Sequence, residues 1–143
     1  MKIRTWLTLA VCALMAAPAA LAAQAEAPAE ALEAAQSWLV LMDADDYARS
    51  WEEGARSFQA AVTAEGWAAQ FAPLRAQLGS VGDRELAGSE RMTDPPGAPA
   101  GEYLHLQYTS TFSGVGRVSE NVVLVREAER GWRVAGYFLQ PAG

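Results

Sequence analysis

Few residues in this chain could carry acid–base or metal chemistry. His105 is the single histidine, so a histidine triad or a multi-histidine metal site would depend on it alone, and no Gly-x-Ser-x-Gly motif accompanies it. In its expected strand, His105 shares a face with Gln107, whereas Leu104 and Leu106 lie on the opposite face. Because the leucine face should pack on helices, we expect His105 at a polar surface or a subunit interface.

Three aspartates close together form a second candidate. Asp43, Asp45 and Asp46 could bind a hard cation such as calcium through their carboxylate oxygens. The glycine and distal glutamate of an EF-hand loop are missing, however, and aspartates between two helices commonly serve as helix caps. We therefore predict capping and no metal site.

Asp83 and Glu85 form the third candidate, a carboxylate pair on one face of a strand. In that geometry one carboxyl group can raise the pKa of the other, as a general base requires. Edge strands also carry alternating charge to block aggregation, and we prefer that interpretation. No catalytic residue is assigned.

Arg84 lies between these carboxylates and so faces the other way, beside the apolar Leu86. An arginine that points inward needs a partner or an anionic ligand.

Tryptophans could line a sugar or lipid pocket, although core packing is the expected use of most of Trp38, Trp51, Trp67 and Trp132. The residues predicted to bind a ligand are Arg84, Trp67, Tyr108 and Tyr137.

Helical spacing organises the first half of the chain. Apolar residues from Leu32 to Met42 predict a first amphipathic helix, and Asp45 or Asp46 suits the N-cap of a short second one. A further turn or two is expected over residues 55–61. Thr63 should cap a third long helix that Gly79 ends, with Pro73 as a local conflict inside it. Its apolar stripe consists of Trp67, Phe71, Leu74 and Leu78.

The second half alternates with a period of two, which predicts strands. The expected strands are residues 81–91, 102–112, 117–127 and 132–139. A Pro- and Gly-rich loop should cover residues 93–101, and tight hairpins residues 113–116 and 128–131. Gly114-Val115-Gly116-Arg117 has some likeness to a phosphate loop, but it joins two strands and is a hairpin turn. The sequence thus predicts an α+β fold, with N-terminal helices packed on a curved antiparallel sheet of about four strands.

The N-terminus has the pattern of a secretory signal peptide. Lys2 and Arg4 precede an uncharged, mostly apolar stretch over residues 6–17, and Ala20-Leu21-Ala22 suits signal peptidase, although cleavage after Ala23 or Ala25 is an alternative. A bilayer span needs about 20 apolar residues, so a retained anchor is disfavoured. A lipoprotein is disfavoured because Val11 precedes Cys12. We expect residues 1–22 to be a signal peptide, 23–30 a flexible leader and 31–141 a single domain.

Cleavage would leave an acidic chain without cysteine. Loss of Lys2 and Arg4 takes the basic residues from 11 to 9, all arginine, against 17 acids. Such a chain would be repelled by nucleic acids and by anionic lipid surfaces, so neither is an expected partner. No disulfide or cysteine-based site could form, and no cofactor is predicted. The alanine- and arginine-rich, lysine-poor composition favours a bacterial periplasmic location.

Six blocks of the chain resemble a bacterial family of exported small domains, domain of unknown function 4019. The blocks are Ala35-Gln36-Ser37-Trp38-Leu39, Asp46-Tyr47-Ala48-Arg49-Ser50-Trp51, Leu78-Gly79-Ser80-Val81 with Arg84, Gly101-Glu102-Tyr103, Val122-Val123-Leu124-Val125-Arg126, and Gly131-Trp132-Arg133-Val134-Ala135-Gly136-Tyr137. More distantly, the chain is similar to the cone-shaped, nuclear-transport-factor-like and cystatin-like folds. The resemblance implies a residual cavity at the open end of the cone. It implies no catalytic residues, because the named family has no established activity.

Three functions are compatible with these observations. The preferred one is a non-enzymatic periplasmic module that binds a small ligand or an envelope protein, with a homodimer through the sheet as one arrangement. The second is a small acid–base enzyme of the isomerase or cyclase type, which needs Asp83, Glu85 or His105 inside an apolar pocket. The third is a structural accessory domain of an envelope assembly.

Overall fold

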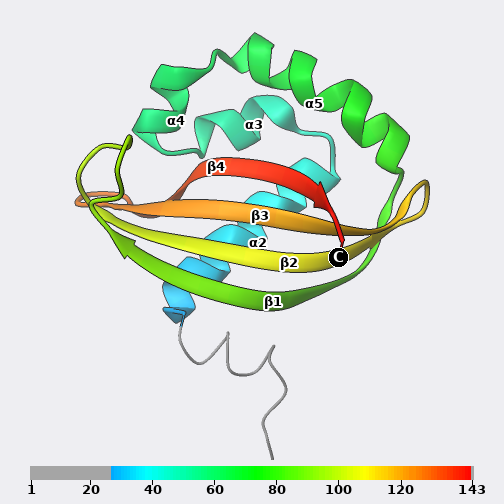
Figure 1. Ribbon diagram of the computed structural model, residues 1–143. Helices are drawn as coiled ribbons and strands as arrows, with labels where there is room; N and C mark the ends of the chain where they lie inside the picture. The colour runs from blue at the N-terminus through cyan, green and yellow to red at the C-terminus, as the bar shows by residue number, and fades with distance from the viewer. Residues whose placement is uncertain (1–26, 143) are drawn as a thin grey trace, which may run out of the picture.

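Residues 27–142 are described by a computed structural model of the chain. The predicted signal peptide and residues 23–26 of the predicted leader lie outside the described residues. Within these residues, four helices precede four strands, coloured from blue to red in Figure 1. They are α2 (Ala29–Asp43), α3 (Tyr47–Glu52), α4 (Arg56–Ala61), α5 (Ala64–Leu78), β1 (Val81–Thr93), β2 (Glu102–Phe112), β3 (Gly116–Glu127) and β4 (Gly131–Pro141).

The helix ends confirm the predicted capping residues. The Asp46 carboxylate accepts a hydrogen bond from the backbone N–H of Arg49, 3.1 Å away, and so begins α3. Thr63 accepts in the same way from the N–H of Gly66 at 3.1 Å and begins α5. Gly79 ends α5 with φ of 79°, a conformation that favours glycine. Helix α2 begins at Ala29, so the last two residues of the predicted leader are helical.

Pro73 does not interrupt α5, which runs from Ala64 to Leu78. Its ring lies on the exposed side of the helix. The buried side of α5 carries Trp67, Phe71 and Leu78, as the apolar stripe predicts.

The four strands form one antiparallel sheet in the order β1-β2-β3-β4, with sequential neighbours paired throughout. The α+β fold predicted from the sequence is therefore confirmed. β2 has the predicted bounds, whereas β1 extends to Thr93 and β4 to Pro141. β1 and β4 are the edge strands, and the ladders that they form contain irregularities between Val81 and Arg84, between Leu86 and Gly88, and opposite Val123 and Leu124.

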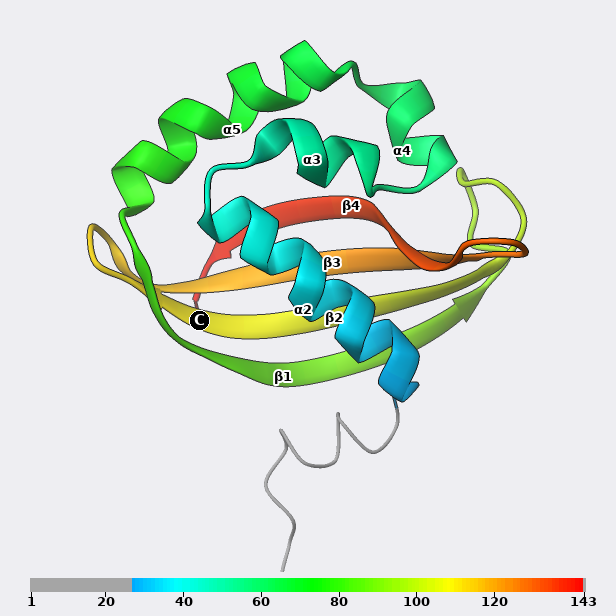
Figure 2. The same ribbon diagram turned by 180° about the vertical axis from the view of Figure 1, so that it is seen from behind.

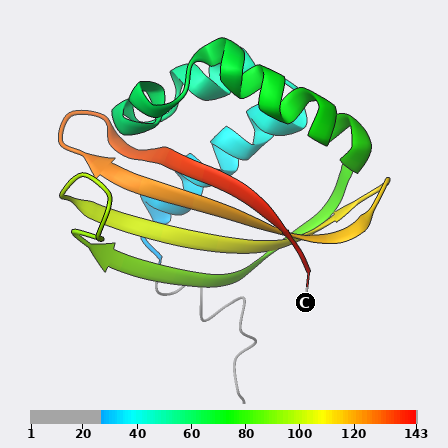
Figure 3. The same ribbon diagram turned by 45° about the horizontal axis from the view of Figure 1, so that its top comes forward.

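Helices α2 to α5 lie on one side of the curved sheet. Seen from behind, α2 crosses the sheet diagonally, while α3, α4 and α5 arch over its β4 edge (Figure 2). Figure 3 shows the opposite sheet face, which no helix covers. Leu104 and Leu106 are fully buried under the helices, whereas His105 lies on the uncovered face. This confirms the predicted facing of β2. Among the described helices, none is long and apolar enough to cross a membrane.

The hairpin between β2 and β3 is anchored to the end of α5. The N–H of Gly114 donates to the carbonyl oxygen of Leu78 at 2.8 Å. A side chain at Gly114 would place its Cβ only 2.4 Å from the carbonyl oxygen of Gln77, so only glycine allows this approach. The contact joins the β2–β3 hairpin to the C-terminal end of α5.

Candidate functional site

Four charged side chains meet between the helices and the sheet. Asp43 comes from the last residue of α2, Arg75 from α5, Arg84 from β1 and Glu120 from β3. We call these four residues the buried charge network. Their formal charges cancel, as burial of ionic groups requires.

Asp43 and Arg84 form the best-aligned pair of the network. The Arg84 guanidinium forms a bidentate pair with Asp43, donating to both carboxylate oxygens at 2.8 and 2.9 Å. Arg75 also donates to Asp43, with Nη2 2.8 Å from Oδ1. A single carboxylate therefore joins an arginine of α5 to an arginine of β1.

Glu120 is the centre of the network and is 0 % exposed. Its Oε1 accepts from Arg84 Nε at 2.7 Å and from the hydroxyl of Ser110. Its Oε2 accepts from the hydroxyl of Tyr137 and lies 3.8 Å from Arg75 Nη1. Both oxygens are thus occupied by protein donors, which leaves this carboxylate no direct contact with solvent or substrate.

The pKa values of Asp43, Arg75 and Arg84 shift in the directions that keep these three groups ionised. Burial acts to raise the pKa of Asp43, but hydrogen bonds and charges from Arg84 and Arg75 outweigh it and hold the pKa below its ordinary value. Burial lowers the pKa of both arginines, and the carboxylates more than reverse that effect. Burial and then the charge of Glu120 raise the pKa of Tyr137 far above its ordinary value, so it remains a donor.

Tyr108 completes the surroundings of Glu120. It is the direct cross-strand neighbour of Glu120 on one side and of Leu86 on the other. Its hydroxyl oxygen is buried and has no hydrogen-bond partner among residues 27–142. Burial raises the pKa of Tyr108 to about 12. The phenol therefore stays neutral beside the ion pairs.

Local sequence explains how two unpredicted residues reach the network. Glu120 occupies the inward side of β3 between Val118 and Val122, where strand alternation places buried side chains. Arg75 follows Phe71 by one helical turn and lies on the buried side of α5. Neither is among the residues predicted from the sequence to form a site. A charge in an otherwise apolar position was the available signal in both cases.

The structure brings three of the four predicted ligand-binding residues together. Arg84 and Tyr137 both bond to Glu120, and Tyr108 is its strand neighbour. Trp67 lies elsewhere, in the aromatic core, where its indole Nε1 donates to Ser50 Oγ at 3.0 Å. Two aromatic rings connect it to Tyr137: that of Phe71, 4.2 Å from Trp67 and 5.4 Å from Tyr137, and that of Trp38, 6.1 Å from Trp67 and 5.2 Å from Tyr137.

The aspartates and glutamate that the sequence offered as metal ligands or as a general base do not gather in one site. Asp45 accepts a hydrogen bond from the Tyr47 hydroxyl, whereas Asp46 caps α3. Within residues 27–142, no group of three or more side chains with metal-binding atoms is arranged to hold an ion. Asp83 and Glu85 are exposed near one end of β1.

His105 is half-buried on the uncovered sheet face. It shares a hydrogen bond of 2.9 Å between Nε2 and the Asn121 side-chain oxygen, and its ring stacks on that of Phe138.

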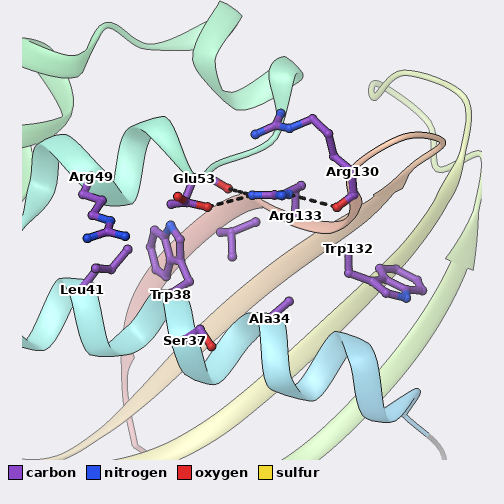
Figure 4. Close-up of a pocket in the computed structure, with 10 residues that line it drawn as sticks. Ala34, Ser37, Trp38, Leu41, Arg49, Glu53, Arg130, Trp132 and Arg133 are labelled. Atoms are coloured by element: carbon purple, nitrogen blue, oxygen red, sulfur yellow. Dashed lines mark hydrogen bonds and ion pairs between the residues drawn. The ribbon is translucent and has the colours of Figure 1, made fainter.

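An open groove lies on the other side of α2, between that helix, α3 and β4. Its volume is about 380 Å³, within the range of small-molecule sites. We call it the α2–β4 groove (Figure 4). It is lined by Ala34, Ser37, Trp38, Leu41, Arg49, Glu53, Arg130, Trp132, Arg133 and Val134.

Two of the three groove arginines are already paired. Arg133 Nη1 lies 2.8 Å from a carboxylate oxygen of Glu53, and its Nε donates to the carbonyl oxygen of Arg130. Arg130 pairs with Glu127 at 2.9 Å and also donates to the carbonyl oxygen of Gly54. These contacts tie β4 and the β3–β4 turn to Glu53 and Gly54, the two residues that follow α3.

Arg49 is different, because its guanidinium has no ion pair or hydrogen bond among the described residues. Figure 4 shows it hanging from α3 toward Leu41 and Trp38 at one end of the groove, with Trp132 at the other end. Sequence reasoning did not single out this groove. The groove forms only because β4 packs beside α2 and α3, and Arg133 of β4 lies 80 positions after Glu53, so no spacing within one element could reveal it.

Comparison with known proteins places this architecture in a family. No curated protein matches the chain. The family model described as protein of unknown function (DUF4019) matches residues 34–137, which include both the network and the groove. The chain belongs to the DUF4019 family.

Proposed function

We propose that this chain is an exported periplasmic binding module, without catalytic activity, that holds a small organic ligand in the α2–β4 groove. The observation that carries the proposal is the groove itself, an open cavity of about 380 Å³ with both apolar and cationic walls. Aliphatic side chains and indole edges can cover the body of a ligand while nearby polar groups orient it. The secretory pattern of the N-terminus supports the location.

The arrangement of the acidic groups favours binding over acid–base catalysis. An enzyme of the isomerase or cyclase type needs a carboxylate or imidazole facing its substrate. Asp83, Glu85 and His105 do not line the groove, and Glu120 is enclosed by its own donors. Glu53, the carboxylate that does line it, is engaged by Arg133.

A pair of groove and control variants tests the proposal. Ser37 lines the groove, whereas its neighbour Gln36 is exposed on α2 and does not. Ser37→Trp should fill the cavity, and Gln36→Trp should add the same side chain outside it. The probes are 1-octanol and octanoate, followed by backbone amide NMR shifts of the purified domain.

We expect at least one probe to give saturable shifts at residues 34–41 and 132–134, retained in Gln36→Trp and lost in Ser37→Trp. Absence of saturable shifts there with both probes would overturn the proposal. Equal binding by the two tryptophan variants would overturn it as well, because the cavity would then not be the site.

A further inference from the structure

Charge is unevenly distributed between the groove and the rest of the chain. The chain carries a net charge of −6, yet three of its ten arginines line one cavity, with Glu53 as the single carboxylate among the lining residues. Glu53 pairs with Arg133, and Glu127, from beside the groove, pairs with Arg130, so the excess positive charge at the groove is that of Arg49. It marks a place where negative charge is stabilised locally, at short range.

The arrangement of α3 sharpens this observation. Arg49 and Glu53 are one helical turn apart, at the spacing where an arginine and a glutamate commonly pair with each other. Glu53 instead reaches across to Arg133 on β4, at 2.8 Å. Arg49 is therefore left at the groove without a carboxylate partner, because the nearby Glu53 is already paired with Arg133.

The floor of the groove differs from its rim. Ala34, Leu41 and Val134 contribute aliphatic surface, and Trp38 and Trp132 contribute the edges of largely buried indoles. The guanidinium groups come from α3, from β4 and from the β3–β4 turn. A ligand that satisfies both parts needs an apolar body and a negatively charged head.

We infer that the α2–β4 groove recognises the carboxylate or phosphate head of a small amphipathic anion, with Arg49 as its first contact. This inference rests on the proposed function, since it names the chemical class that the same groove binds. The head docks on Arg49, and the body lies along α2 toward Trp132. Glu53 acts as an internal competitor, because its carboxylate holds Arg133 until an external anion displaces it.

The experiment compares three probes with the same eight-carbon body. Octanoate carries a carboxylate head, octyl phosphate a phosphate head and 1-octanol no charge. Dissociation constants are measured by titration calorimetry and by the NMR shifts of the groove amides, at low salt and at 0.5 M sodium chloride. At low salt, octanoate or octyl phosphate should bind about tenfold more tightly than 1-octanol, because hydrogen bonds to charged groups are the stronger ones.

Three variants separate the roles of the charged residues. Arg49→Gln should bring the dissociation constant of the charged probe to within about twofold of that of 1-octanol, because the charged contact is lost. The substitution keeps the backbone N–H of residue 49, so the Asp46 cap of α3 remains. Arg117→Gln is the control, because Arg117 is exposed on β3 and does not line the groove. Glu53→Gln should tighten binding of the charged probe by about two- to fivefold, the range of an exposed ion pair.

The possible results separate the two claims. If 1-octanol binds in the groove as tightly as both charged probes, the inference is overturned and the proposed function stands. If Arg49→Gln and Arg117→Gln bind octanoate and octyl phosphate alike, Arg49 is not the contact and the inference is also overturned. If no probe shifts the groove amides, both claims fail together.

Discussion

Helix α2 separates two groups of arginines that differ in how completely carboxylates pair with them. Arg75 and Arg84 share Asp43 and Glu120, and every charge in their group has a partner. Of the groove arginines, Arg133 pairs with Glu53 and Arg130 with Glu127, whereas Arg49 has no carboxylate partner among the described residues. The first group is closed to ligands because its own side chains satisfy it, whereas the second keeps capacity for an external anion. Removing one partner of a buried ion pair is costly, whereas Arg49, an exposed arginine without a carboxylate partner among the described residues, is available for binding.

The largest expected effect is at Trp67, in the aromatic core behind the buried charge network. Its ring contacts those of Phe58 and Phe71 at 4.7 and 4.2 Å, and its side chain is almost fully buried. Trp67→Ala should lower the free energy of unfolding by about 3–5 kcal/mol, measured by urea denaturation. Leu41→Ala, in the half-exposed groove wall, should cost clearly less. Equal losses would show that the two sides of α2 are not packed differently.

The second prediction compares the arginines directly. Arg84→Met removes the partner that bonds to both Asp43 and Glu120, so buried negative charge loses its compensation. The cost should be about 3 kcal/mol of unfolding free energy, at the low end of the range for broken buried pairs because Arg84 is partly exposed. Arg49→Met should change it by less than about 0.5 kcal/mol. A small loss from Arg84→Met would mean that the network does not stabilise the fold.

The third prediction uses pH to test whether ionised Asp43, the partner of Arg84 and Arg75, stabilises the fold. The folded pKa of Asp43 lies below its ordinary value of 3.8, because Arg84 and Arg75 outweigh the effect of burial. In the window between the folded pKa and 3.8, the unfolded chain binds more protons than the folded one, so stability rises with pH there. The contribution of Asp43 is thus fully present above that window and is lost as the pH falls through the folded pKa.

Urea denaturation of the wild type and Asp43→Asn between pH 2.5 and 7 measures this contribution. The difference in unfolding free energy should be constant above about pH 5 and shrink below pH 4. A difference that stays constant down to pH 2.5 would show that the ionised form of Asp43 is not the stabilising one.

Period and capping signals predicted most of the fold, because they act locally. Thr63, Asp46 and Gly79 mark helix ends through their own backbone or side-chain bonds, so a single sequence reveals them. The period of two in β2 placed Leu104 and Leu106 under the helices correctly. The likeness to a cone-shaped fold and the homodimer through the sheet stay predictions.

The candidate site was less accessible to sequence reasoning. The inward facing of Arg84 followed from its apolar neighbour Leu86, but its partner Glu120 lies 36 positions later in the chain. The groove depends on Glu53 and Arg133, which are 80 positions apart and meet only because α3 arches over β4. Contacts of that range follow from tertiary packing, and no local pattern encodes them.

The smallest expected effect is on the uncovered face of the sheet, which neither arginine group reaches. Changing Asp83, Glu85 and His105 together to Asn, Gln and Gln keeps side-chain size while removing two negative charges. Each change should alter the free energy of unfolding by less than about 0.5 kcal/mol, because the two carboxylates are exposed and Gln at position 105 can still bond to Asn121.

Thermal melting checks the fold, and octanoate titration checks the groove. A folded triple variant that binds octanoate normally but fails to restore growth or envelope function in a deletion strain would transfer the biological role from the groove to this face. Normal complementation by the triple variant, together with loss of complementation by Arg49→Gln, would place that role in the groove.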